Sequence, residues 1–144
     1  MVFKKRKEVA NLHDKYVSTS TFELERLYKN YLMNNENINL GFKLGEDAII
    51  FTDKRLIFTE NSNAGENGIS LMSVNLFSII QATIEVGEIN EVDFSYIDST
   101  YLKEQTPDYE NYTLEFQNKN DAQNVYKILQ EIAYTNCLTI NNIK

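Results

Sequence analysis

The sequence predicts a mainly β (α+β) domain in which seven short strands form an antiparallel meander and helices lie at both ends of the chain. Apolar residues recur at every second position in the middle of the chain, where a hairpin signature also occurs. They recur with helical spacing near both ends. The 144 residues, 42% of them apolar, are enough for one domain with a sizeable core and too few for two.

Residues 1–36 predict an N-terminal helical extension. Ser20 and Glu23 have the spacing of a capping box, so we expect a helix to begin there. A weaker helical pattern upstream includes Tyr16 and Val17 and predicts another short helix before the Ser and Thr residues at 18–21. The apolar stripe of the second helix consists of Leu24, Leu27, Tyr28, Tyr31 and Leu32.

Strand patterns begin at Ile38, where apolar and polar residues alternate up to Leu44. Two apolar runs then flank the tetrapeptide Thr52-Asp53-Lys54-Arg55, and an Asp in such a turn can hydrogen-bond its own backbone. These residues therefore predict a β-hairpin. The expected strands are 38–44, 47–52, 55–60, 69–74, 80–86, one within 92–102, and 112–117.

The last predicted element is a helix that starts with a capping box of Asn120 and Gln123. An amphipathic helix after the last strand would plug the open end of an antiparallel barrel. We therefore divide the chain into the extension 1–36, a domain 37–136 and a C-terminal tail 137–144. The apolar face of the helix consists of Ala122, Val125, Tyr126, Leu129, Ile132 and Ala133.

The hairpin and its surroundings resemble the bacterial pleckstrin-homology-like family over residues 36–134, most closely in FTDKRLI at 51–57. The resemblance implies a seven-stranded, strongly bent antiparallel barrel capped by the C-terminal helix. It also implies assembly into symmetric homo-oligomers. It implies no reaction, because this fold hosts many kinds of recognition. Residues 87–111 depart from the family pattern, since they are longer and more acidic than its usual connection.

The hairpin residues Thr52, Asp53, Lys54 and Arg55 form a structural motif in our interpretation. Lipid-binding relatives of the fold hold phosphates with basic residues in a hairpin loop, so phosphate binding by Lys54 and Arg55 is the alternative. Only two bases occur here, and Glu46 and Asp47 precede them. We therefore expect Arg55 to pair with a carboxylate such as Asp47 or Asp53.

The net charge of −7 argues against a nucleic-acid surface. The charge is uneven, because the N-terminus is basic and the remaining residues carry −11. A basic terminus beside an aromatic residue can contact an anionic membrane, and this is the alternative function. The residues of this possible contact are Phe3, Lys4, Lys5, Arg6 and Lys7.

Catalytic and metal-binding residues are scarce. The only histidine is His13 and the only cysteine is Cys137, so neither a Cys-His pair nor a zinc site is expected. Residues 88–110 contain seven acidic residues but lack the order of a calcium loop, and a solvated strand edge is the simpler interpretation. We expect no catalytic residue, no metal and no cofactor.

The predicted function is a non-enzymatic protein-interaction or assembly module that forms a homo-oligomer and binds another protein. Nine tyrosines and eight phenylalanines support this, because aromatic residues are enriched where protein surfaces meet. A single cysteine, no signal peptide and no run of about 20 apolar residues predict a cytoplasmic location. No nucleic acid is expected as a partner, and membrane contact ranks below protein contact.

Overall fold

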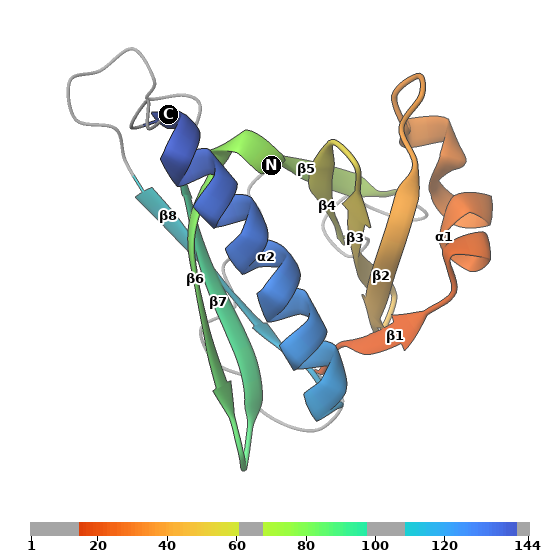
Figure 1. Cartoon of the computed structure of the whole chain (residues 1–144). Coiled ribbons are helices and arrows are strands. Elements are labelled where there is room, and N and C mark those ends of the chain that lie inside the picture. Colours follow the sequence, from red (N-terminus) through yellow and green to blue (C-terminus); the bar gives the residue numbers. More distant parts are fainter. Residues whose placement is uncertain (1–14, 61–67, 98–108, 141–144) are drawn as a thin grey trace. The chain divides into compact units, whose positions relative to one another are not determined.

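The computed structural model describes residues 15–60, 68–97 and 109–140 (Figure 1). They fall into two compact units. The first unit contains Tyr16–Asn75, and the second unit begins at Leu76 and also includes Lys15. Each unit has its own antiparallel sheet, of five strands in the first and three in the second.

The first unit is a meander, because its strands are hydrogen-bonded in the order in which they occur in the chain. Helix α1 (Thr21–Tyr28) and the 3-10 turn η2 (Lys29–Tyr31) lie between the first two strands in sequence. Ser20 caps α1, since its hydroxyl accepts a hydrogen bond of 3.1 Å from the Glu23 N–H, as the capping pattern predicts. The strands are β1 (Val17–Thr19), β2 (Ile38–Leu44), β3 (Asp47–Thr52), β4 (Arg55–Glu60) and β5 (Ser70–Asn75).

The middle of this sheet is apolar on both faces. Helix α1 covers one face, where Leu24 and Tyr28 pack with residues of β3 and β4 in a buried cluster. Side chains that alternate with these, such as Ile49 and Phe58, are buried as well. β3 and β4 therefore form the core of the first unit. The cluster under α1 consists of Leu24, Tyr28, Ala48, Ile50 and Ile57.

Gly41 of β2 makes room for α1. A Cβ atom at this position would collide with Leu24 Cδ1 and would lie 3.1 Å from the Ile49 carbonyl oxygen. Leu24 is fully buried, so it has little space to move away. We expect Gly41→Ala to lower the free energy of unfolding by about 1 to 3 kcal/mol. Urea denaturation measures this change. Asn39→Ala, at an exposed position of the same strand, is the control, and equal losses for both variants would contradict the prediction.

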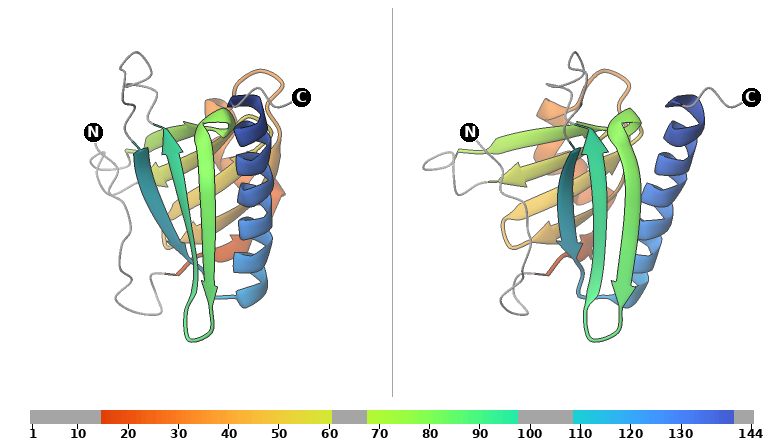
Figure 2. Two further views of the ribbon diagram at one scale, coloured as in Figure 1. Left: turned by 60° about the vertical axis from the view of Figure 1, so that its left-hand side comes forward. Right: turned by 90° about the vertical axis from the view of Figure 1, so that its left-hand side faces the viewer.

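The second unit consists of a three-stranded sheet, a 3-10 turn and a long helix. The turn η3 (Leu76–Ser78) leads into β6 (Ile79–Val86), which is followed by β7 (Asn90–Ile97) and β8 (Tyr109–Glu115). Helix α2 (Lys119–Ile140) contacts β6 and, to a lesser extent, β7, and Figure 2 shows that it runs alongside β6. Its fully buried side chains are Ala122, Val125, Leu129 and Ala133.

Most of the predicted elements are present. The seven expected strands correspond to β2 through β8, and β7 pairs with β8 in a continuous register. The helix predicted around Tyr16 and Val17 is wrong for these residues, because Val17–Thr19 is a strand that pairs with β2. The predicted cap of α2 is also wrong, since the helix begins at Lys119 and the Asn118 side chain accepts the Asn120 N–H at 2.8 Å.

Helix α2 continues past residue 136 as far as Ile140. Among the described residues, no helix is both long enough and apolar enough to cross a bilayer.

Candidate interaction surfaces

The β3–β4 hairpin has a tight turn that one hydroxyl group organises. Phe51 and Leu56 lie opposite each other and are the paired residues nearest the turn. The Thr52 hydroxyl oxygen accepts hydrogen bonds from the N–H groups of Lys54 at 3.1 Å and Arg55 at 3.0 Å. The same hydroxyl lies 2.7 Å from Glu36 Oε2, to which it donates. Thr52 thus satisfies the turn backbone and connects it to a buried carboxylate.

Glu36 and Arg55 form the central ion pair of the first unit. Arg55 Nε lies 2.8 Å from Glu36 Oε2, and Arg55 Nη2 lies 2.9 Å from Oε1, so the contact is bidentate. The Glu36 side chain is fully buried and the Arg55 side chain is 12% exposed. Burial alone would raise the pKa of Glu36. Hydrogen bonds from Arg55, Thr52 and the Met33 N–H, with the Arg55 charge, outweigh burial and lower this pKa to about 2.

Asp53 connects the turn to the segment before β2. Its Oδ1 accepts the Asn37 N–H at 3.0 Å, and its own N–H donates to the Asn37 carbonyl at 3.1 Å. The backbone hydrogen bond from Asn37 is the main reason that the pKa of Asp53 is lowered. The turn is therefore fixed on two sides, by Glu36 and by Asn37.

Arg55 is occupied by protein atoms and is not available for a phosphate group. Besides Glu36, its guanidinium donates to the Ser73 hydroxyl at 2.7 Å and to the Tyr31 carbonyl at 2.8 Å. Its carboxylate partner is Glu36 and not Asp47 or Asp53, the partners suggested by the sequence. Lys54 is exposed. These contacts favour the structural interpretation of the hairpin motif.

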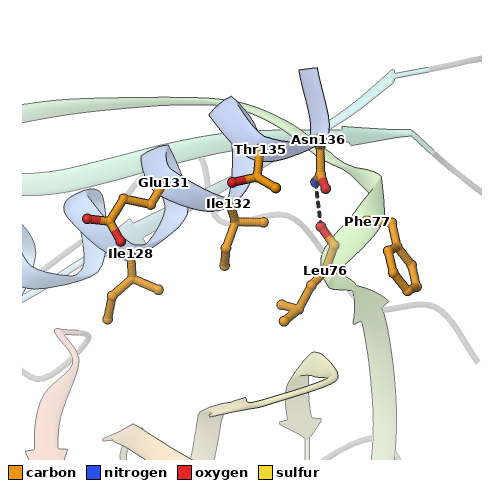
Figure 3. Close-up of a pocket in the computed structure, with 7 residues that line it drawn as sticks. All are labelled: Leu76, Phe77, Ile128, Glu131, Ile132, Thr135 and Asn136. Atoms are coloured by element: carbon orange, nitrogen blue, oxygen red, sulfur yellow. Dashed lines mark hydrogen bonds between the residues drawn. The ribbon is translucent and has the colours of Figure 1, made fainter. Parts of the chain in front are cut away.

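An apolar row on the second unit is the strongest candidate for a contact surface. Leu76, Ile128 and Ile132 are half-buried, and in Figure 3 their side chains point to the same side of helix α2. Phe77 lies at the end of this row and is 80% exposed. The row lines a groove of about 380 Å³, which also includes Glu131. We call Leu76, Phe77, Ile128 and Ile132 the apolar row.

Asn136 holds the turn that presents Phe77. Its Nδ2 group donates to the carbonyl oxygens of Leu76 and Ile79, each at 2.7 Å (Figure 3). These bonds join η3 to helix α2 over about 60 residues of sequence and fix the position of the turn. Neither Phe77 nor Asn136 was predicted from the sequence as a site residue. The one available signal was an aromatic residue in a short segment with neither helical nor strand periodicity.

The remaining candidate residues are spread through the chain. Phe3, Lys4, Lys5, Arg6, Lys7 and His13 lie outside the described residues, so membrane contact stays a prediction. Cys137 is exposed on helix α2. In residues 15–60, 68–97 and 109–140, no group of three or more His, Cys, Asp or Glu side chains is arranged to hold a metal ion.

Two antiparallel sheets followed by a C-terminal helix define a pleckstrin-homology-like domain, a class that is generally non-catalytic. The family model of the bacterial PH domain matches residues 9–133, and the chain belongs to this family.

Solved structures support the same fold. A DUF1696 family protein with a pleckstrin-homology domain from Shewanella loihica PV-4 has a TM-score of 0.60 and 18% identity, over 83% of this chain and 97% of that one. The pleckstrin homology domain from Shewanella amazonensis SB2B has a TM-score of 0.54 and 20% identity, over 80% of this chain and 89% of the other. No curated protein matches the chain.

Proposed function

We propose that this protein is a non-enzymatic interaction and assembly module that forms a homo-oligomer through the apolar row. The observation that carries the proposal is Phe77, which is 80% exposed beside the half-buried Leu76. Contiguous apolar groups on a protein surface mark interaction sites, and Phe is enriched at the centres of such sites. Burial of the Phe77 side chain alone is worth about 1.5 to 3 kcal/mol.

The surroundings of the row suit a protein interface. Its centre is apolar, while Glu131 and Thr135 provide polar groups at the margin of the groove. The Asn136 hydrogen bonds fix η3, so little conformational freedom is lost when a partner binds Phe77. A second copy of this chain is a natural partner, because a two-fold contact places the same patch on both subunits.

The test compares two exposed phenylalanines. Phe77→Ser should weaken self-association at least tenfold, since it removes the most exposed apolar side chain of the proposed interface. Phe22→Ser is the matched control, because Phe22 is 78% exposed on helix α1 of the first unit, and it should leave association unchanged. Light scattering coupled to size-exclusion chromatography measures the masses at micromolar concentrations. Circular dichroism checks that both variants are folded.

Two results would refute the proposal. One is a wild-type mass of 16.7 kDa at every accessible concentration, because the chain is then a monomer. The other is an oligomer that survives Phe77→Ser unchanged, because the apolar row is then not the interface. A loss of association in the Phe22 variant alone would place the interface on the first unit.

A further inference from the structure

Strands β6 to β8 contain acidic residues and no basic ones. Their acids are Glu85, Glu91, Asp93, Glu110 and Glu115. Glu91 lies directly opposite Glu85 on β6 and opposite Glu115 on β8, so three carboxylates form a row across the sheet. Like charges in directly opposite positions destabilise a sheet. The row of carboxylates is therefore unfavourable for the stability of this sheet.

Asp93 adds to the negative charge of the same face. It is two residues from Glu91, and side chains at this spacing point to the same side of a strand. Its Oδ1 atom is buried and has no hydrogen-bond partner among the described residues. Burial raises the pKa of Glu91, and the charges of Asp93, Glu115 and Glu85 raise it further. A cation on this face would reduce the repulsion between the carboxylates and would give Asp93 Oδ1 a partner.

The acidic face is hollowed. A depression of about 480 Å³ is lined by Glu91 and Asp93 together with polar side chains of all three strands, including Thr83, Ser95 and Thr113. A long basic side chain fits such a depression, because its methylene stem can lie along the sheet while its charged group reaches the carboxylates. We call this depression and the carboxylates around it the acidic face.

Lys15 already makes a contact of this kind. Its Nζ atom lies 3.3 Å from Glu115 Oε2, and the side chains are 18% and 8% exposed. Lys15 is also the first residue that the structure describes, and its ion pair with Glu115 lies on the acidic face. Lys7 is eight residues before Lys15. An extended segment of that length spans about 26 Å, more than twice the roughly 10 Å across three strands.

We infer that the basic segment Lys4, Lys5, Arg6 and Lys7 binds the acidic face of its own chain. The charges of the segment and of the acidic face are complementary. The segment has four cations, and the face has the carboxylates of Glu85, Glu91, Asp93 and Glu115. The connection through Lys15 makes the contact intramolecular and so raises the effective concentration of the segment. The inference does not depend on the apolar row. It means that the cations available to an anionic membrane are held by the protein itself.

Zero-length crosslinking of the full chain tests the contact. A carbodiimide joins a lysine amine to a nearby carboxylate as an amide, with loss of water. Links from Lys4, Lys5 or Lys7 to Glu91 or Asp93 should be at least tenfold more abundant than links to Glu25, an exposed carboxylate on helix α1. The Lys15 to Glu115 link is the positive control. Salt at 1 M, where the Debye length is about 3 Å, should reduce the predicted links at least fivefold.

Denaturing electrophoresis separates links within a chain from links between chains. The predicted links should come from the 16.7 kDa band. Predicted links found only in a band of twice that mass would overturn the intramolecular contact. A spread of links over all exposed carboxylates would overturn it as well. The Phe77→Ser variant should give the same links, so that a failure of the oligomer proposal is distinguished from a failure of this one.

Limited trypsin digestion provides a second measurement. The double variant Glu91→Gln, Asp93→Asn should increase cleavage after Lys4 to Lys7 at least fivefold, because the segment is released. The matched control Glu25→Gln, Glu46→Gln removes two exposed carboxylates from the first unit and should leave this cleavage rate unchanged. Cleavage after Lys54 reports the general stability of the fold. Equal cleavage of the segment in both double variants would refute the inference.

Discussion

Glu36→Gln is expected to lower the free energy of unfolding at pH 7 by about 3 kcal/mol, because it leaves the Arg55 cation without its carboxylate. The Arg55 side chain is only 12% exposed, so water does not compensate for the lost partner. The neutral amide also cannot accept both guanidinium bonds and the Thr52 hydroxyl as the carboxylate does. Urea denaturation of the wild type and the variant measures the loss. Glu25→Gln, at an exposed position of α1, is the control.

The same pair predicts a dependence of stability on pH. The pKa of Glu36 is lowered in the folded protein from 4.5 to about 2. A lowered pKa stabilises the fold above the unfolded value, and this stabilisation is lost as the pH falls from 4.5 to 2. The shift corresponds to about 3 kcal/mol. The stability difference between wild type and Glu36→Gln should therefore shrink by about this amount between pH 6 and pH 2.

A double variant separates the pair from its individual groups. Arg55→Met removes the cation, and in that background Glu36→Gln should cost much less than it does alone, because no buried charge is left unpaired. Equal costs in both backgrounds would show that the ion pair does not couple the two residues. A stability difference that is constant between pH 6 and pH 2 would show that the pKa of Glu36 is not lowered.

Leu129→Asp is expected to have the largest effect of any change considered. Leu129 is fully buried on the side of helix α2 that also buries Val125 and Ala133. The variant loses the apolar contacts of this buried position and must also bury or neutralise a charge. We expect a loss of more than about 4 kcal/mol, which is close to the whole stability of many domains.

Two further variants keep this prediction testable if the Asp variant does not fold. Leu129→Ala should fold and lose about 2 to 5 kcal/mol in urea denaturation. Gln130→Asp introduces the same charge at the next, exposed position of α2 and should change stability by less than about 0.5 kcal/mol. An unchanged melting temperature for Leu129→Asp would mean that the core of the second unit lies elsewhere.

Local sequence determines the elements that were predicted correctly. The β3–β4 hairpin depends on apolar runs next to the turn residues Asp53 and Lys54, and each of these signals acts within a few positions. Helix α2 depends on a 3.6-residue period maintained over many turns. Signals that are this strong and this local are seldom overridden by tertiary contacts. Both elements could therefore be predicted without any knowledge of their neighbours in the fold.

The features that were predicted wrongly or missed depend on contacts between residues that are far apart in the sequence. Val17–Thr19 is a strand because Ser18 lies opposite Phe42 of β2, and three residues carry too little periodicity to reveal this. Glu36 is 19 residues before Arg55, and no local pattern connects the two. Phe77 lies in η3, and the side chain that holds this turn, Asn136, comes from helix α2 about 60 residues later. In each case a contact across the fold overrides the local preference.

The central strands also have a consequence for the chain before it folds. β3 and β4 place nine buried residues around one turn, five in β3 and four in β4. The two strands have high β-propensity and no proline or glycine, a composition typical of aggregating segments. Charged residues stand at every end of these runs: Asp47 before the first, Asp53, Lys54 and Arg55 between them, and Glu60 after the second. Such gatekeepers slow the stacking of identical strands from different molecules. We therefore expect the charges of the hairpin motif to slow aggregation of the unfolded chain, in addition to the part that the motif plays in the turn.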